Sequence, residues 1–143
     1  MQNDTVNLLK ECNSGIKMGV NSIDKVLPYV SDRNLKKSLN ACKDEHATLG
    51  DETHRLLLKY KASTKDPHPV ARAMSSMKTS GKMLVDRTDN TIADVMTDGC
   101  NMGVKSLSKY LNRYPKADQR AKSIAQRLIS VEETLTQDLR TYL

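Results

Sequence analysis

The sequence contains no tryptophan and no phenylalanine, and tyrosine, with five copies in 143 residues, is its only aromatic residue. Glycine, proline and cysteine are also scarce, at six, four and three copies. This composition excludes collagen-like and low-complexity chains, and five aromatic rings are too few for a base-stacking platform. Because 38% of the residues are hydrophobic and 28% are charged, we expect a folded chain of single-domain size, spanning residues 1–143.

Long hydrophobic runs are absent as well, since no stretch approaches the roughly 20 residues that a membrane-spanning helix needs. The first residues show no basic stretch followed by an apolar one, which is the pattern of a secretory signal. Cys12, Cys42 and Cys100 are odd in number, far apart and match no CxxC or zinc-ligand spacing. We therefore expect a cytoplasmic protein with reduced cysteines and no membrane partner.

The net charge of +6 is spread evenly along the chain. Residues 1–72 carry 12 basic and 9 acidic side chains, and residues 73–143 carry 11 and 8, with the two signs interleaved in both halves. No basic run is longer than Lys36-Lys37. This pattern is typical of a solvated mixed-charge surface, so we expect no nucleic-acid partner.

Apolar residues recur at alternating spacings of three and four in four stretches, which is the pattern of a helix face buried against a core. Period-two alternation of β-branched residues is absent. The sequence therefore predicts an all-α fold, an antiparallel four-helix bundle. The predicted helices lie near residues 5–30, 33–62, 88–113 and 116–142, with an extra helical segment at 68–85.

Capping residues and prolines set the predicted helix ends. Asn3-Asp4-Thr5 offers capping oxygens to the first helix, and Ser31-Asp32 offers them to the second. Pro28 and Pro115 end the first and third helices because a proline ring cannot continue the backbone ladder. The polar run at residues 86–90 interrupts or re-caps the chain before the third helix.

An internal repeat relates the two halves of the chain. Residues 15–27 and 99–111 are identical at seven of thirteen positions with a shift of 84, and the second helix matches the last with a shift of 86. The repeat predicts two duplicated helical hairpins, at about 5–62 and 88–142, joined by a bridging segment at about 63–87.

Two glycine pairs occur at equivalent places in this repeat, Gly15/Gly19 and Gly99/Gly103. A mid-helix glycine costs about 1 kcal/mol relative to alanine, so close packing must compensate for it. We expect the first and third helices to pack tightly through these glycines, while a dimer contact or space for a buried ligand remains open.

The run Asp44-Glu45-His46, together with Ser14-Gly15 and Asp98-Gly99, resembles the small bacterial ferritin-like domain family of unknown function. The resemblance covers most of the chain. It implies a four-helix bundle with an interrupted segment before the third helix. It also implies a midpoint of the bundle where metal ligands would lie.

A first turn near residues 30–32 places Ile16 opposite His46, and the repeat then places Cys100 opposite Glu132. The resemblance implies that metal-binding members need a carboxylate near both Ile16 and Cys100, and neither residue supplies one. We therefore expect an incomplete di-iron set and no ferroxidase activity. His46 is predicted to be a core histidine bonded to Glu132 or to a backbone carbonyl. The alternative is a reduced iron or zinc site with Glu45, His46, Glu132 and Cys100 as ligands.

Catalytic sequence motifs are lacking, since GxSxG, Walker-type, GxGxxG and HExxH patterns do not occur. We expect a non-catalytic protein without a cofactor that acts through protein association, as a homo-oligomer or with another protein. Met74 and Met77 in the bridging segment are the predicted contact. A metal-binding protein holding iron or zinc is the alternative.

Overall fold

The computed structural model describes residues 2–61 and 86–143, and this part of the chain consists of helices joined by short turns and loops, without a β-strand. The all-α class predicted from the sequence is confirmed. The predicted segment at 68–85, with Met74 and Met77, lies outside the described residues. The elements are α1 (Gln2–Val26), the 3-10 turn η1 (Leu27–Tyr29), α2 (Arg33–Lys59), α4 (Asp89–Arg113), α5 (Gln119–Leu139) and the 3-10 turn η2 (Arg140–Tyr142).

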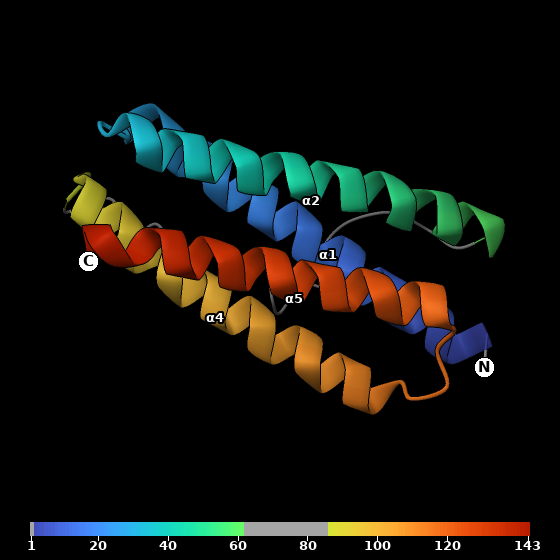
Figure 1. Ribbon diagram of the computed structural model, residues 1–143. Helices are drawn as coiled ribbons and strands as arrows, with labels where there is room; N and C mark the ends of the chain where they lie inside the picture. Colours follow the sequence, from blue (N-terminus) through green and yellow to red (C-terminus); the bar gives the residue numbers. More distant parts are fainter. Residues whose placement is uncertain (1, 62–85) are drawn as a thin grey trace.

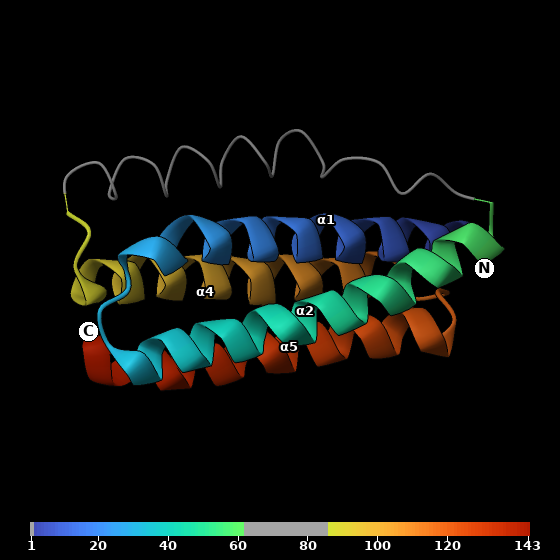
Figure 2. The same cartoon turned by 90° about the horizontal axis from the view of Figure 1, so that it is seen from above.

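The four helices share one long direction and form a helical bundle (Figures 1 and 2). Helix α1 packs most extensively on α2, and α4 packs most extensively on α5. The two pairs meet through contacts between α2 and α5 and between α1 and α4. None of the helices in the described ranges combines the length and hydrophobicity that crossing a membrane would require.

Side-chain caps fix where α2, α4 and α5 begin. Asp32 accepts a hydrogen bond from the backbone N–H of Leu35, as predicted from the Ser31-Asp32 pair. Thr88 caps α4, which confirms that the polar run at residues 86–90 starts a new helix. Asp118 caps α5 through the N–H of Ala121. Each cap satisfies a backbone donor that the first helical turn leaves without a partner.

The start of α1 differs from the prediction. The helix already includes Gln2, so the Asn3-Asp4-Thr5 run lies inside its first turn and does not cap it. Asp4 and Thr5 instead accept hydrogen bonds from the backbone N–H groups of Lys116 and Asp118, at 2.9 and 2.8 Å. Their oxygens therefore fasten the loop before α5 to α1.

Matching hydrogen bonds tie both ends of α2 and α5 together. The hydroxyl of Tyr60, at the end of α2, donates to Asp118 at the start of α5 over 2.8 Å. The hydroxyl of Tyr142, just after α5, donates to Asp32 at the start of α2 over 2.7 Å. The end of each helix therefore lies beside the beginning of the other.

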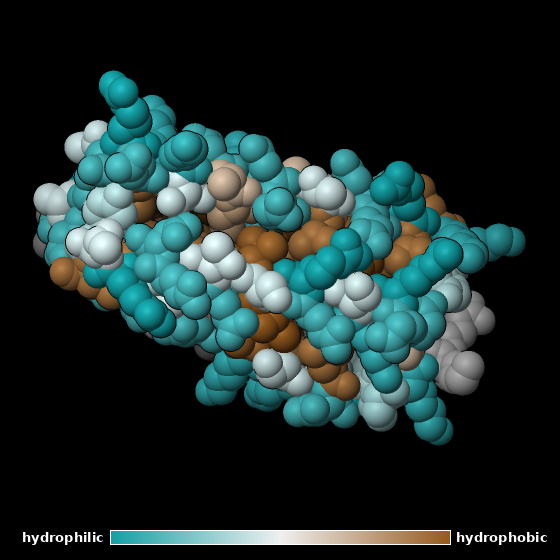
Figure 3. Space-filling model, viewed as in Figure 1, coloured by the Kyte–Doolittle hydropathy of each residue, from teal (hydrophilic) through white to brown (hydrophobic). Residues whose placement is uncertain are grey.

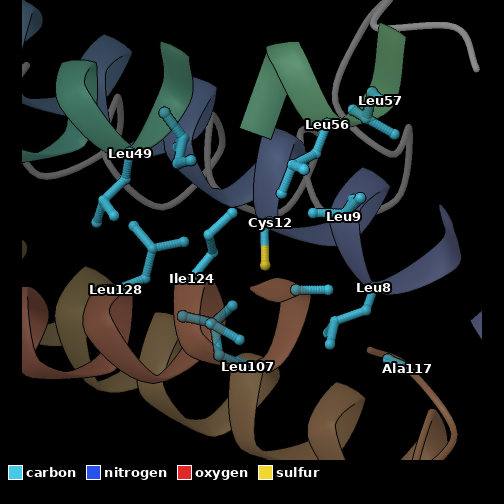
Figure 4. Packing of buried hydrophobic residues seen from close by; sticks show 13 residues of the cluster. Leu8, Leu9, Cys12, Leu49, Leu56, Leu57, Leu107, Ala117, Ile124 and Leu128 are labelled. Atoms are coloured by element: carbon cyan, nitrogen blue, oxygen red, sulfur yellow. The ribbon is translucent and has the colours of Figure 1, made fainter. Parts of the chain in front are cut away.

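The buried hydrophobic residues form two clusters along the bundle. One surrounds Cys12, Ile124 and Leu128, where leucines from α1, α2 and α4 also meet (Figure 4). The other lies around Leu39 and Leu135. Fully burying one such side chain contributes about 1.5–3 kcal/mol. Hydrophobic atoms also show through the middle of one face, between hydrophilic side chains (Figure 3).

Candidate functional site

His46 on α2 is the most buried polar side chain in the middle of the bundle, with 1% of its surface exposed. It lies on the same helix face as the core residues Cys42 and Leu49, because residues three and four apart share a face. Its Nδ1 is 2.8 Å from the carbonyl oxygen of Cys42, and its Nε2 is 2.8 Å from Oε1 of Glu132 on α5. Both ring nitrogens therefore have partners.

The imidazole is charged at neutral pH. Burial by itself lowers the pKa of His46, but the hydrogen bonds to the Cys42 side chain, whose Sγ is 3.5 Å from Nδ1, and to Glu132, together with the negative charge of Glu132, outweigh burial and raise this pKa to about 10. Both ring nitrogens then carry protons and donate, Nδ1 to the Cys42 carbonyl and Nε2 to the Glu132 carboxylate. His46 and Glu132, whose side chains are 1% and 13% exposed, form an ion pair inside the bundle.

Gly19 on α1 provides the space for this ring. A Cβ atom at position 19 would lie 2.7 Å from Nε2 and 2.8 Å from Cδ2 of His46, which is closer than real Cβ atoms approach other side chains. A Cβ atom at Gly103 on α4 would lie 3.6 Å from the carboxylate of Glu132, an ordinary contact. Gly15 and Gly99 face no atom of the described chain within 4 Å. The nearest atoms at Gly19 and Gly103 thus belong to α2 and α5, and Gly19 makes room for the ion pair.

Cys100 on α4 is 2% exposed, and its thiol interacts with Glu132. Burial raises the pKa of its thiol, and the charge of Glu132 and a hydrogen bond to that carboxylate raise it further. The thiol is therefore neutral. A neutral thiol is a poor nucleophile and a poor metal ligand, because the thiolate is the reactive form.

The structure brings two of the four predicted ligands into contact, because His46 and Glu132 form the predicted hydrogen bond, which is confirmed. Cys100 is buried, and burial and the charge of Glu132 raise the pKa of its thiol. Glu45 is exposed, because it is one residue from His46 and so points about 100° away around α2. The participation of Cys42 was not predicted, although its i, i+4 spacing from His46 on one helix face was a usable signal.

The depth at which α1 and α2 face each other differs from the prediction. Gly19, and not Ile16, lies against His46, while Ile16 lies beside Gly50, where a Cβ would be 3.2 Å from its Cγ2. The 3-10 turn Leu27–Tyr29 rises about 2 Å per residue and carries the chain past the end of α1 before α2 begins. The residue of α1 that faces His46 is therefore displaced along α1 by almost one helical turn from the predicted position.

The residues at this level do not suit a ferritin-like metal centre. Gly19, which lies against His46, offers no ligand, His46 carries a proton on each nitrogen, and Cys100 is neutral. Within residues 2–61 and 86–143, no three histidine, cysteine, aspartate or glutamate side chains are grouped so that they could hold a metal ion.

We compared the chain with protein-family models, with curated proteins and with solved structures, and none of the three comparisons gave a match.

Proposed function

We propose that this chain is a cytoplasmic, non-catalytic, ferritin-like protein that acts by associating with protein, either another copy of itself or a different protein. The observation that carries the proposal is the ion pair in the middle of the bundle. One ring nitrogen of His46 is hydrogen-bonded to the Cys42 carbonyl on its own helix, and the other is hydrogen-bonded to Glu132. The side chains that a ferritin-like protein would direct at a metal are therefore engaged with each other, and their contribution is to hold α2 against α5.

Two duplicated hairpins in an antiparallel bundle are part of this proposal, and the contacts of the ion pair support them. Gly19 faces His46, and Gly103 faces Glu132. The two contacts are related by the shifts of 84 and 86 residues that the repeat gives for the first and second helix of each hairpin. Equivalent positions in the two halves of the chain therefore make equivalent contacts.

The hydrogen bonds at the bundle ends support the same duplication. The N–H of Asp118 donates to Thr5 near the start of α1, and the N–H of Asp32 donates to Asp89 at the start of α4. Shifts of 84 and 86 again convert one bond into the other. Equivalent hydrogen bonds thus connect the helices at both ends of the bundle, and the ion pair connects them in the middle.

A buried charged pair contributes little net stability compared with an apolar pair of similar size, whereas breaking it by removing one partner costs about 3–5 kcal/mol. Its value is specificity, since α5 can slide along α2 only by separating His46 from Glu132. A bundle whose helices cannot slide along one another keeps a fixed outer surface, which suits it to binding a partner.

Light scattering over a tenfold range of concentration tests self-association. We expect a mass that rises above 16.0 kDa as the concentration increases, and a mass of 16.0 kDa throughout would refute the homo-oligomer. Ferrous iron added in air tests the non-catalytic part of the proposal, and oxidation well above the buffer rate would refute it.

The competing proposal is an iron or zinc site built from Glu45, His46, Glu132 and Cys100. The interaction of Glu132 with both His46 and Cys100 is its support. Elemental analysis of protein purified without added metal separates the two proposals, because one metal ion per chain would favour this site.

A further inference from the structure

One end of the bundle gathers most of the unpaired positive charge. At this end α1 begins, α2 and α4 finish and α5 begins (Figure 1). We call it the basic end and define it as residues 2–11, 52–61 and 104–128. Its eleven basic side chains are Lys10, Arg55, Lys59, Lys61, Lys105, Lys109, Arg113, Lys116, Arg120, Lys122 and Arg127.

The basic end contains four acidic residues, and two of them form hydrogen bonds that hold the loop before α5 and the first turn of α5 in place. Asp4 accepts a hydrogen bond from the N–H of Lys116 at 2.9 Å. Asp118 accepts from the N–H of Ala121 and from the hydroxyl of Tyr60, at 2.9 and 2.8 Å. These carboxylates therefore serve the fold and form no salt bridge with a lysine or arginine in the described ranges.

The other two acidic residues neutralise one cation between them. Glu52 holds the guanidinium of Arg127 through two hydrogen bonds of 2.8 and 2.9 Å. Glu11 is hydrogen-bonded to the hydroxyl of Tyr110. Ten of the eleven cations thus have no salt-bridge partner among the described residues. Nine of these ten are exposed, and Lys122 is half-buried.

The rest of the described chain has the opposite balance, with eight basic and twelve acidic side chains. There the basic groups lie among carboxylates, as in the 2.6 Å pair of Lys43 with Asp24. Positive and negative charge are thus separated along the length of the bundle. Clustered charge of one sign attracts a partner of the opposite sign and accelerates its association.

The aromatic residues at the basic end favour a protein partner over a nucleic acid. Tyr110 and Tyr114 stack on each other, with ring centres 6.4 Å apart, and the guanidinium of Arg113 lies 5.7 Å from the centre of Tyr110. Both rings also pack against the hydrophobic core, so they are not free to stack on bases. Leu58, by contrast, is 57% exposed at this end and offers a contact to an apolar side chain.

We infer that the basic end binds an acidic segment of a partner protein, in which aspartate and glutamate side chains are mixed with apolar ones. The carboxylates pair with the lysines and arginines of α2, α4 and α5, and an apolar side chain covers Leu58. This inference rests on the proposed association role and assigns it a surface and a partner chemistry. It requires no change in the fold, because the cations already project into solvent.

Charge reversal at the two bundle ends tests the inference. The probe is a fluorescently labelled peptide of about twelve residues that contains glutamate, aspartate and leucine, and its binding is followed by fluorescence anisotropy. The test variant is Lys59→Glu/Lys116→Glu/Arg120→Glu. The matched control is Arg33→Glu/Lys36→Glu/Lys37→Glu at the opposite end, where three exposed cations are also reversed. Circular dichroism confirms that both variants remain helical.

We expect the test variant to bind the peptide at least roughly tenfold more weakly and the control to stay within about twofold of the parent protein. Binding should weaken as salt is raised, because exposed charges are screened. Absence of binding by the parent protein, or equal losses in both variants, would overturn the inference. Tighter binding of single-stranded or duplex DNA of equal charge, or of anionic phosphatidylserine vesicles, with the same loss in the test variant, would also overturn it. If light scattering shows oligomers and the peptide does not bind, the association role stands without this surface.

Discussion

Replacing Gly19 with alanine should destabilise the protein, although replacing a glycine with alanine inside an ordinary helix stabilises that helix. The new methyl group would lie 2.7 Å from Nε2 and 2.8 Å from Cδ2 of His46. The ring has little freedom to move away, because Nδ1 is bonded to the carbonyl of Cys42 and Nε2 to Glu132. The substitution must therefore break one of these bonds or move α1 away from α2.

The size of the effect follows from three opposing contributions. Loss of a hydrogen bond to a charged group costs about 1.5–3 kcal/mol, and overpacking of a well-filled core costs about 1–3 kcal/mol. Alanine gains about 1 kcal/mol over glycine in helix propensity. We therefore expect Gly19→Ala to lower the free energy of unfolding by about 1.5–5 kcal/mol. Gly103→Ala is the matched control, because its methyl group meets Glu132 at an ordinary 3.6 Å.

Urea denaturation followed by circular dichroism measures both variants. Gly103→Ala should be unchanged or stabilised by up to about 1 kcal/mol. In a His46→Ala background the ring is gone, so the cost of Gly19→Ala should disappear and the double-mutant cycle should show a coupling energy about equal to that cost. If Gly19→Ala is as stable as the parent protein, or if its cost persists without His46, the steric explanation is wrong.

Three further predictions concern the ion pair, the bundle ends and the cysteine. The raised pKa of His46 means that the pair contributes its full stability below pH 6.5 and loses it as the pH rises through about 10. Glu132→Gln should therefore reduce the pH dependence of the urea midpoint over this range. An unchanged pH dependence would contradict the pairing. Tyr60→Phe removes the hydrogen bond to Asp118 and should lower the free energy of unfolding by less than about 1 kcal/mol in the same assay, since this bond is partly exposed. A larger decrease would show that the hydroxyl does more than connect the two helix ends. Cys100 is buried with a raised thiol pKa, so mass spectrometry should find it unmodified by iodoacetamide in the folded protein and alkylated in urea; rapid alkylation of the folded protein would count against this environment.

The pairing of His46 with Glu132 could be predicted because it depends on two regular patterns. The apolar stripe places His46 on the inner face of its helix, and the repeat shift of 86 residues converts position 46 into position 132. In a two-fold arrangement of hairpins, equivalent positions meet at the centre. The position of Gly19 could not be predicted in this way, because the depth at which α1 faces α2 depends on the path of the chain through the 3-10 turn Leu27–Tyr29.

Local chemistry in the sequence determined where most helices begin and end. The carboxylate of Asp32, the hydroxyl of Thr88 and the ring of Pro115 act on backbone groups within a few residues, so their effects do not depend on distant parts of the chain. The first helix is the exception. Asp4 and Thr5 read as capping residues, but hydrogen bonds to a loop more than a hundred residues away engage their oxygens.

The full charge separation was decided only by the tertiary structure. The sequence balances its two halves, although residues 104–128 already carry seven basic side chains and one acidic side chain. Folding adds the start of α1 and the end of α2, which are distant in sequence, to the end of α4 and the start of α5. Local bonding and helix periodicity act over a few residues and can be read from the sequence, whereas Coulomb attraction acts through space and depends on which helix ends become neighbours.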